Sequence, residues 1–238
     1  MDKKETINTK KEKLDFISLT AHQLKRPLSS IKLSLEMLYK GNFGRISKEQ
    51  KDVIEKILQR SKGLIYLVND LLDMAKIEER GLVNNLIQVD IVELIEFILE
   101  FEMNEITNKK IKFKFEKTYN SIKVKIDKEK ISMAIRNVID NAVKYTPTRG
   151  KITISLDKNG ENLEIKIQDS GIGIPDNQKE KIFGKFFRAD NAIEMESSGS
   201  GLGLFIARHI IESHKGKIWF ESKEGIGTTF FIHLPIGS

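Results

Sequence analysis

The residues of this chain that can do chemistry begin with one histidine. His22 lies in the run Ala21-His22-Gln23-Leu24-Lys25-Arg26-Pro27. A neutral, solvent-accessible imidazole is a nucleophile that can accept a phosphoryl group. Pro27 has no backbone N–H, so the Gln23 carbonyl lacks the hydrogen-bond donor that a helix would give it. This predicts a bend in the helix beside the histidine. Considered alone, a histidine of this kind is more often an ordinary surface residue of a coiled coil.

A second group of chemically capable residues follows more than a hundred residues later. Asn137, Asn141, Lys144 and Tyr145 are spaced i, i+4, i+7 and i+8, which puts them on one face of a helix. An asparagine amide oxygen is a suitable ligand for hydrated Mg²⁺. Lys144 can hold a phosphate, and Tyr145 offers a ring to an adenine. The alternative to a nucleotide site, given equal weight, is an ordinary amphipathic helix whose polar stripe faces water.

Two glycine motifs complete the set. The run Asp169-Ser170-Gly171-Ile172-Gly173 follows a strand, where a carboxylate can accept a hydrogen bond from the exocyclic amine of adenine. The run Gly199-Ser200-Gly201-Leu202-Gly203 opens a helix, and glycine amides at a helix N-terminus bind anions such as phosphate. It is not a P-loop, because no Gly-Lys-Ser/Thr follows.

The segment between the glycine motifs is polar over residues 190–198 and is predicted to be a mobile lid. Arg188, at the base of this lid, is expected to point at phosphate. Three nearby phenylalanines could either anchor the lid or belong to the hydrophobic core: Phe183, Phe186 and Phe187. Thr229, in the last turn-and-strand motif, is also assigned to cofactor binding.

The element that carries His22 is predicted to be a heptad helix. Apolar residues recur at steps of 3 and 4 from Leu14 to Leu38, and His22 falls at position b, off the seam. Ser47-x-x-Gln50 is a capping box for a second helix that ends near Arg80. The second helix has two adjacent apolar stripes, so we expect an all-α hairpin that forms a dimeric four-helix bundle in a homodimer.

The remaining residues predict an α/β sandwich with one solvated sheet face. Period-two alternation marks strands, and Asn159-Gly160 is a hairpin signal. Asp90 and Asp127 are expected to cap helices. The expected strands are 111–115, 122–126, 152–156, 163–167, 217–222 and 228–234, and the helices 90–106, 127–145 and 203–213. The predicted domains are 1–82 and 83–238.

Composition limits the possible partners. The 238 residues have a net charge of +6, but the lysines alternate with acids, so we expect solvated faces and no nucleic-acid partner. No cysteine is present, which excludes disulfides and thiolate metal sites. The sequence contains no apolar stretch of ~20 residues that could span a membrane, and no secretory signal is visible. A cytoplasmic location is therefore expected. His209, His214 and His233 show no metal-ligand spacing and are interpreted as structural.

Together these motifs resemble the sensor histidine kinases of two-component systems. Residues 10–80 resemble the dimerisation and phosphoacceptor domain, and residues 86–235 the Bergerat-type ATP-binding domain. The resemblance implies ATP-dependent autophosphorylation of His22 in a homodimer, then transfer to an aspartate of a response regulator receiver domain. It also implies that Asn141 binds Mg²⁺ with Asn137 beside the phosphates, that Asp169 binds adenine, and that Lys144, Arg188 and the 199–203 amides contact phosphate.

Two positions depart from that family pattern. Gln23 replaces the usual glutamate after the histidine, so it can fix the imidazole tautomer but adds no charge, which predicts slower transfer. Arg26 replaces the usual threonine or asparagine that helps position water, which predicts weak phosphatase activity.

These departures leave two alternatives open. One is a degenerate, ATP-binding dimeric scaffold or phosphotransfer module. The other is a conformational ATPase of the gyrase/Hsp90 class, which would need a carboxylate base; Asp140 does not share the face of Asn141. The chain is expected to be either a soluble kinase or the cytosolic part of a longer membrane-bound sensor.

Overall fold

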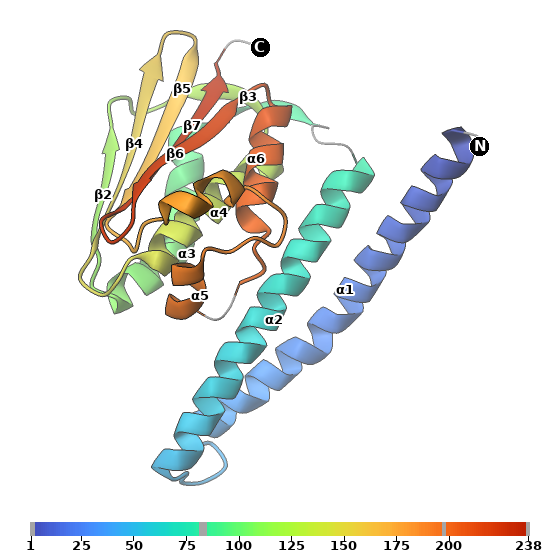
Figure 1. Cartoon of the computed structure of the whole chain (residues 1–238), viewed down its shortest axis with the longest axis vertical. Coiled ribbons are helices and arrows are strands. Elements are labelled where there is room, and N and C mark those ends of the chain that lie inside the picture. Colours follow the sequence, from blue (N-terminus) through green and yellow to red (C-terminus); the bar gives the residue numbers. More distant parts are fainter. Residues whose placement is uncertain (1–2, 81–84, 197–198, 237–238) are drawn as a thin grey trace. The chain divides into compact units, whose positions relative to one another are not determined.

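The computed structural model describes residues 3–80, 85–196 and 199–236; within the first two helices, several side chains, including that of His22, lie outside the described part. The chain divides into two compact units (Figure 1). One is a helical hairpin over the first 81 residues, and the other is an α/β unit over most of the remainder. Each unit is described below by itself.

The hairpin consists of α1 (Lys3–Tyr39) and α2 (Lys48–Arg80). Helix α1 includes the polar residues before Leu14 and runs through Pro27 without a break. The capping box at the start of α2 is confirmed. The Ser47 amide donates to Gln50 Oε1 at 2.8 Å, and the Gln50 amide donates to Ser47 Oγ at 3.2 Å. These reciprocal bonds satisfy two amides that the helix itself leaves without partners.

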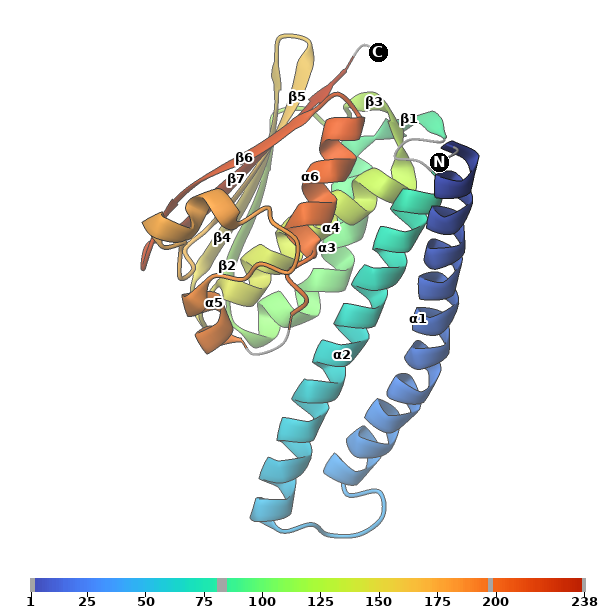
Figure 2. The ribbon, with the colours of Figure 1, turned by 45° about the vertical axis from the view of Figure 1, so that its right-hand side comes forward.

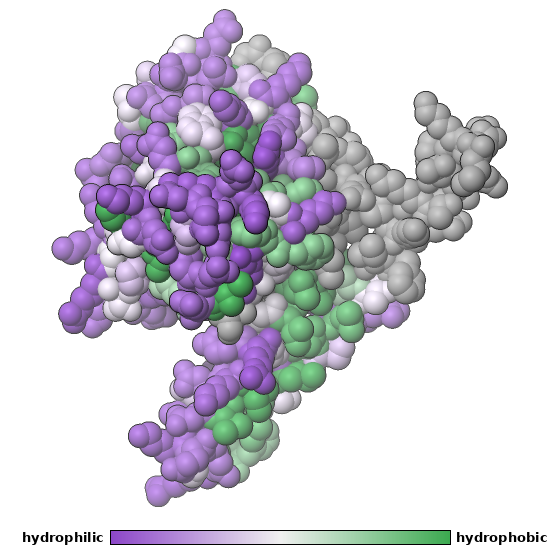
Figure 3. All heavy atoms as spheres, in the orientation of Figure 1, coloured by the Kyte–Doolittle hydropathy of each residue, from purple (hydrophilic) through white to green (hydrophobic). Residues whose placement is uncertain are grey.

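The hairpin leaves much of its apolar surface uncovered. Its small buried cluster contains Ala21, Val68 and Leu72, with Leu28 packed against it. Figure 3 shows hydrophobic residues gathered along the lower half of the hairpin. Among the side chains of this unit that the structure describes, the large apolar ones that are 37–70% exposed are Leu19, Leu24, Ile31, Leu33, Leu38, Phe43, Val53, Ile57 and Leu64. A surface of this size normally marks an interaction site.

The α/β unit contains a five-stranded sheet in the order β2-β4-β5-β7-β6, in which only the β2–β4 pair is parallel. Helices α3, α4 and α6 lie on one face of this sheet (Figure 2). The elements are β1 (Leu86–Asp90), α3 (Ile91–Asn108), β2 (Lys112–Lys117), β3 (Lys123–Asp127), α4 (Lys128–Tyr145), β4 (Lys151–Asn159), β5 (Asn162–Asp169), a 3-10 helix (Asp176–Lys181), α5 (Asp190–Met195), α6 (Gly203–Ser213), β6 (Lys217–Lys223) and β7 (Gly227–Pro235).

Strand alternation decides which sheet face is buried. Ile152, Ile154 and Leu156 are at most 1% exposed and face the helices, while the residues between them face away. Burying each such side chain stabilises the fold by about 1.5–3 kcal/mol. The predicted sandwich with one solvated sheet face is confirmed.

Two details differ from the prediction. The strand expected at 122–126 is β3, but it pairs only with β1 in a separate two-stranded antiparallel sheet. Strand β1 was not predicted, because the alternation of its residues covers only the four positions from Ile87 to Asp90. The hairpin loop between β4 and β5 is Gly160-Glu161, one residue later than Asn159-Gly160, because Asn159 and Asn162 pair across the strands.

Local caps position the helices that carry the candidate site. Asp90 accepts a hydrogen bond from the Val92 amide at 2.9 Å, and Asp127 accepts one from the Lys130 amide at 3.3 Å. His214 is buried at the end of α6, where its Nε2 accepts from the Asp127 amide at 3.1 Å. Burial lowers the pKa of His214, so its imidazole stays neutral and can accept this bond. The structural interpretation of His214 is consistent with this geometry.

Candidate functional site

The polar face of α4 is the first part of the candidate site. Asn137, Asn141, Lys144 and Tyr145 are half-buried, while the opposite face of α4 packs into the core. The Asn137 amide Nδ2 donates to the Gly203 carbonyl at 3.1 Å, which joins α4 to the start of α6. The Lys144 ammonium lies 5.6 Å from the centre of the Tyr145 ring. Burial raises the pKa of Tyr145, against a lowering effect of the Arg188 charge.

Asp169 ends β5 and points at two backbone amides. Its Oδ1 accepts hydrogen bonds from Gly171 N at 2.8 Å and from Thr228 N at 3.1 Å. Burial raises the pKa of Asp169 to about 6, although both hydrogen bonds act in the other direction. Among the described residues, no hydrogen bond reaches Oδ2. The carboxylate is therefore held firmly by one oxygen and can accept a donor on the other.

Glycine is required in the loop that follows Asp169. A Cβ on Gly171 would lie 2.5 Å from the Tyr145 carbonyl oxygen and 2.7 Å from Asp169 Oδ1. Gly173 has φ +64°, and a Cβ there would lie 2.1 Å from the Lys223 carbonyl oxygen. The loop can therefore lie directly against the end of α4 and the turn between β6 and β7.

We predict that Gly173→Ala lowers the free energy of unfolding by about 3 kcal/mol, measured by urea denaturation. The positive φ costs about 1–2 kcal/mol, and the clash with the Lys223 carbonyl adds a similar amount. Gly160→Ala is the matched control, because Gly160 has φ +62° but nothing within 4 Å of the added Cβ. Equal losses in the two variants would show that the close approach is not what requires glycine.

The second glycine motif leads into α6. Gly201 has φ +71°, and a Cβ there would lie 2.7 Å from the Phe186 carbonyl carbon. Leu202 is buried and occupies the N-cap position, where it gives no side-chain cap, and Gly203 is the first residue of α6. Gly199 also has a positive φ, of +150°. The expected glycine-rich helix start is thus present in the fold.

The polar segment that was expected to be a lid is described over residues 190–196, while residues 197 and 198 lie outside the described part. It contains a short helix, α5, held by side chains at both ends. The Asn191 amide Nδ2 donates to the Gly173 carbonyl at 3.0 Å, and the Asp190 amide donates to Gln178 Oε1 at 3.0 Å. Arg188 Nη2 donates to the Ala192 carbonyl at 3.1 Å and to the Glu196 carbonyl. In this structure, the Arg188 guanidinium therefore binds the backbone of the segment itself.

The three phenylalanines before this segment do not share one role. Phe183 is half-buried, with its ring centre 5.9 Å from that of Phe220. Phe187 is also half-buried. Phe186, by contrast, is 60% exposed and has φ +59°. The core interpretation fits Phe183 and does not fit Phe186.

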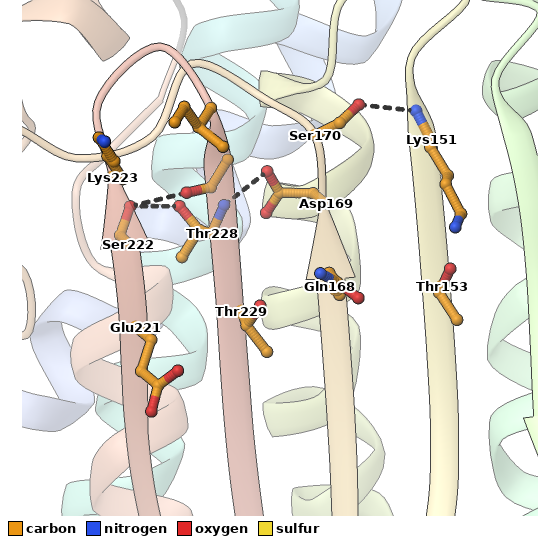
Figure 4. Close-up of a pocket in the computed structure, with 12 residues that line it drawn as sticks. Lys151, Thr153, Gln168, Asp169, Ser170, Glu221, Ser222, Lys223, Thr228 and Thr229 are labelled. Carbon is orange, nitrogen blue, oxygen red and sulfur yellow. Dashed lines mark hydrogen bonds between the residues drawn. The ribbon is translucent and has the colours of Figure 1, made fainter.

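The structure places Thr229 away from Asp169. A cavity of about 410 Å³ at the strand ends is lined by Asp169 and Thr228, and also by Thr229 and its cross-strand neighbour Gln168. Figure 4 shows these side chains. The neighbours of Thr229 and Gln168 in β7 and β5, Phe230 and Ile167, are buried toward the helices, so Thr229 lies on the opposite sheet face. Thr228, not Thr229, faces Asp169.

Sequence reasoning missed Thr228 and Ser222. The Ser222 hydroxyl lies 2.8 Å from that of Thr228 and accepts from the Ile174 amide at 2.9 Å, which ties the loop after Asp169 to the last hairpin. The period of two in β7 was a usable signal for Thr228, because Phe230 is clearly a core position and Thr228 shares its face. Ser222 had no such signal.

The residues of the histidine motif belong to the hairpin. His22 lies within α1, but its side chain is outside the described residues, so its expected exposure at position b stays a prediction. Gln23 and Arg26 are exposed. In the part of the chain that the structure describes, no group of three His, Cys, Asp or Glu residues could hold a metal ion. No helix there is long and apolar enough to cross a membrane.

Comparison with known proteins identifies both units. Residues 12–80 match the family model of the His Kinase A (phospho-acceptor) domain. Residues 126–238 match that of the histidine kinase-, DNA gyrase B- and HSP90-like ATPases. The sensor histidine kinase WalK of Bacillus subtilis is 36% identical over 95% of this chain, and WalK of Staphylococcus epidermidis is 33% identical over 98%. The chain spans 38% of the length of either relative.

Solved structures show the same relationship. The catalytic domain of the histidine kinase ThkA is 31% identical, with a TM-score of 0.56, and the match covers 64% of this chain and 97% of that domain. ThkA in complex with the response regulator protein TrrA is 26% identical, with a TM-score of 0.63, over 98% of this chain and 66% of ThkA. With a phosphoacceptor-type hairpin followed by a domain of the ATPase type, the chain belongs to the sensor histidine kinases.

Proposed function

We propose that this chain transfers the γ-phosphoryl group of ATP to His22 and then to an aspartate of a response regulator receiver domain. The observation that carries the proposal is the pairing of a phosphoacceptor-type hairpin that contains His22 with a domain of the ATPase family. The half-buried, doubly hydrogen-bonded Asp169 supports a nucleotide site in that domain. We propose a domain boundary between residues 82 and 83, which lie outside the described residues, between α2 and β1.

The proposed nucleotide site follows the geometry above. Asp169 accepts the adenine amine on its second oxygen, beside Gly171, where any Cβ would crowd the carboxylate. Tyr145 lies near the base. Thr228, in place of Thr229, is assigned to nucleotide binding. Gly173 supports the loop. The phosphate side is assigned to Asn137, Lys144, Arg188 and the amides of Gly199, Gly201, Leu202 and Gly203.

Arg188 fits this assignment only after a rearrangement. Its guanidinium would have to leave the carbonyls of Ala192 and Glu196 when nucleotide binds. Movement of the 190–196 segment on binding would release it, as lids do in other phosphoryl-transfer enzymes.

A magnesium ion fits the chain if ATP supplies most of its ligands. The described residues offer no acidic or histidine cluster for a metal, but Mg²⁺ typically binds substrate phosphates together with one or two protein oxygens and several waters. The Asn141 amide oxygen, one turn from Asn137 on α4, is the proposed protein ligand. When bound, the ion would neutralise charge on the phosphate oxygens.

The proposed reaction uses the neutral form of His22. A lone pair of its imidazole forms the P–N bond while the bond from the γ-phosphorus to the β,γ-bridging oxygen breaks, and ADP leaves with that electron pair. The other ring N–H donates to Gln23, which holds the tautomer. In the second step, a carboxylate oxygen of the receiver aspartate takes the phosphoryl group and the P–N bond breaks.

We further propose that the chain works as a homodimer in the cytoplasm, where ATP is available. A second hairpin would cover the apolar side chains that one hairpin exposes, completing a four-helix bundle. The relatives are much longer than this chain and are named as sensors. This is consistent with a kinase core tethered to a sensor region.

Arg26 is expected to make the chain a poor phosphatase. A long cation at this exposed position cannot position a water molecule as a hydroxyl or amide does. Adding the chain to a phosphorylated receiver domain, with ADP present, should leave its phosphate lifetime nearly unchanged, and Arg26→Thr should shorten it. Rapid dephosphorylation by the unaltered chain would refute this assignment.

A dimeric ATP-binding scaffold is the second candidate, because Gln23 and Arg26 both weaken the histidine motif. Transfer to a receiver domain separates the two functions. The chain is first labelled with γ-labelled ATP, freed of nucleotide, and mixed with a receiver domain from a related system. Movement of the label to the receiver, and its loss when the receiver aspartate is replaced by asparagine, supports the kinase. A chain that binds ATP but never becomes labelled supports the scaffold.

A further inference from the structure

The end of α4 is capped by a lysine from another part of the chain. The Lys109 ammonium donates to the carbonyls of Val143 at 2.9 Å, Lys144 at 2.8 Å and Thr146 at 3.4 Å. The last carbonyls of a helix have no partner within the helix and form the negative end of its dipole. A fixed cation at this point therefore satisfies three acceptors at once and stabilises the last turn of α4.

The backbone of Lys109 is itself held in place. Its amide donates to the Glu105 carbonyl at 3.0 Å and closes α3, and its carbonyl accepts from the Arg149 amide at 2.8 Å. Arg149 has φ +67° and lies in the connection from α4 to β4. The ammonium thus reaches α4 from a position fixed by two neighbouring elements.

The same turn of α4 supports the proposed nucleotide site. The Tyr145 carbonyl accepts a hydrogen bond from the Ile172 amide at 3.2 Å, in the middle of the loop that follows Asp169. A Cβ on Gly171 would lie only 2.5 Å from that carbonyl oxygen, so the loop lies directly against the helix end. Movement of the last turn would therefore move Tyr145 and the Asp169–Gly173 loop together.

We propose that Lys109 is a positioning residue for nucleotide binding, acting through the C-terminus of α4 without touching the nucleotide. The proposal rests on the assignment of ATP to the Asp169 site. A neutral side chain at position 109 would leave three carbonyls without their donor, and the last turn would fray. Because removing a charge-assisted cap of this kind weakens the helix end that supports the loop, we expect about a tenfold loss of ATP affinity.

The test compares four variants of the full chain in calorimetric titrations with ATP and Mg²⁺. Lys109→Met removes the charge, and Lys109→Arg retains a donor for the carbonyls. Lys110→Met is the matched control, because Lys110 is the exposed neighbouring lysine. Ile218→Val is the stability control, since this buried residue lies in β6 at the end of the sheet far from Asp169. All titrations are done well below the melting temperature of the least stable variant.

Lys109→Met should raise the dissociation constant for ATP about tenfold, with Lys109→Arg recovering most of the loss. Lys110→Met and Ile218→Val should bind like the unaltered chain, even though Ile218→Val melts at a lower temperature. Lys109→Met binding as tightly as Lys110→Met would overturn the proposal, because Lys109 would then contribute stability alone.

Hydrogen exchange without nucleotide separates this proposal from the assignment of ATP. In Lys109→Met, amides in segments 143–147 and 170–174 should exchange faster. Exchange at 217–220 and 230–235, the parts of β6 and β7 that do not contact the loop, should not change. If the unaltered chain binds no ATP, the proposed function fails, and this exchange pattern alone decides whether Lys109 positions the loop. Unchanged exchange at 170–174 would overturn the coupling.

Discussion

Replacing Asp169 with asparagine is expected to raise the dissociation constant for ATP about a hundredfold. One oxygen at this position must accept from the amides of Gly171 and Thr228. In the variant, the amide oxygen keeps that role, and the NH₂ group takes the place of the second carboxylate oxygen. A donor would then face the donating amine of adenine, so a charge-assisted hydrogen bond is lost and two donors are left unpaired.

Calorimetric titration with ATP measures this loss directly. Asp176→Asn is the matched control, because Asp176 is a surface carboxylate paired with Lys179 at 2.6 Å. Burial raises the pKa of Asp169 to about 6, so the affinity of the unaltered chain should fall as the pH falls through that value, because adenine binds the ionised form. The asparagine variant should lack this pH dependence. An unchanged affinity in Asp169→Asn would place adenine elsewhere.

Replacing Gln23 with glutamate is expected to speed autophosphorylation by about tenfold to a hundredfold. The ring N–H of His22 has a hydrogen-bond acceptor in either variant, but only a carboxylate offsets the positive charge that develops as the imidazole attacks. Gln23 is exposed in α1, so the added charge has little desolvation cost. The change should therefore affect the rate much more than the stability.

The rate is measured as initial incorporation of label from γ-labelled ATP at saturating nucleotide. Gln59→Glu is the control, since it adds the same charge at another exposed position of the hairpin, in α2. The two variants should bind ATP alike, which separates a chemical effect from a binding effect. No gain in Gln23→Glu over Gln59→Glu would show that charge at position 23 does not limit the reaction.

Features that depend on neighbours in the sequence could be predicted. The capping box at Ser47 and the aspartate caps at positions 90 and 127 each involve residues two or three positions apart, so their spacing was a sufficient signal. The glycine loops were recognisable for a similar reason, because the crowding at Gly173 excludes any side chain.

Features that depend on the whole fold could not be read from spacing. The pairing of β3 with β1 joins segments with a helix and a strand between them. The Arg188 guanidinium binds carbonyls whose position depends on how the 190–196 segment folds. The cap on α4 comes from Lys109, which is 34 to 37 residues away from its acceptors. One feature of this kind could have been predicted: the period of two in β7 places Thr228 on the sheet face of Asp169 and Thr229 on the opposite face.

Incubating the chain with γ-labelled ATP and Mg²⁺, beside a His22→Ala variant, tests whether His22 is the phosphoacceptor. A phosphohistidine is stable in alkali and labile in acid, so the chemistry of the label identifies the residue type. We expect acid-labile, alkali-stable label on the unaltered chain and none on the variant, with equal ATP binding by both. Equal labelling of the variant, or no label on a chain that binds ATP, would contradict His22 as the phosphoacceptor of an active kinase.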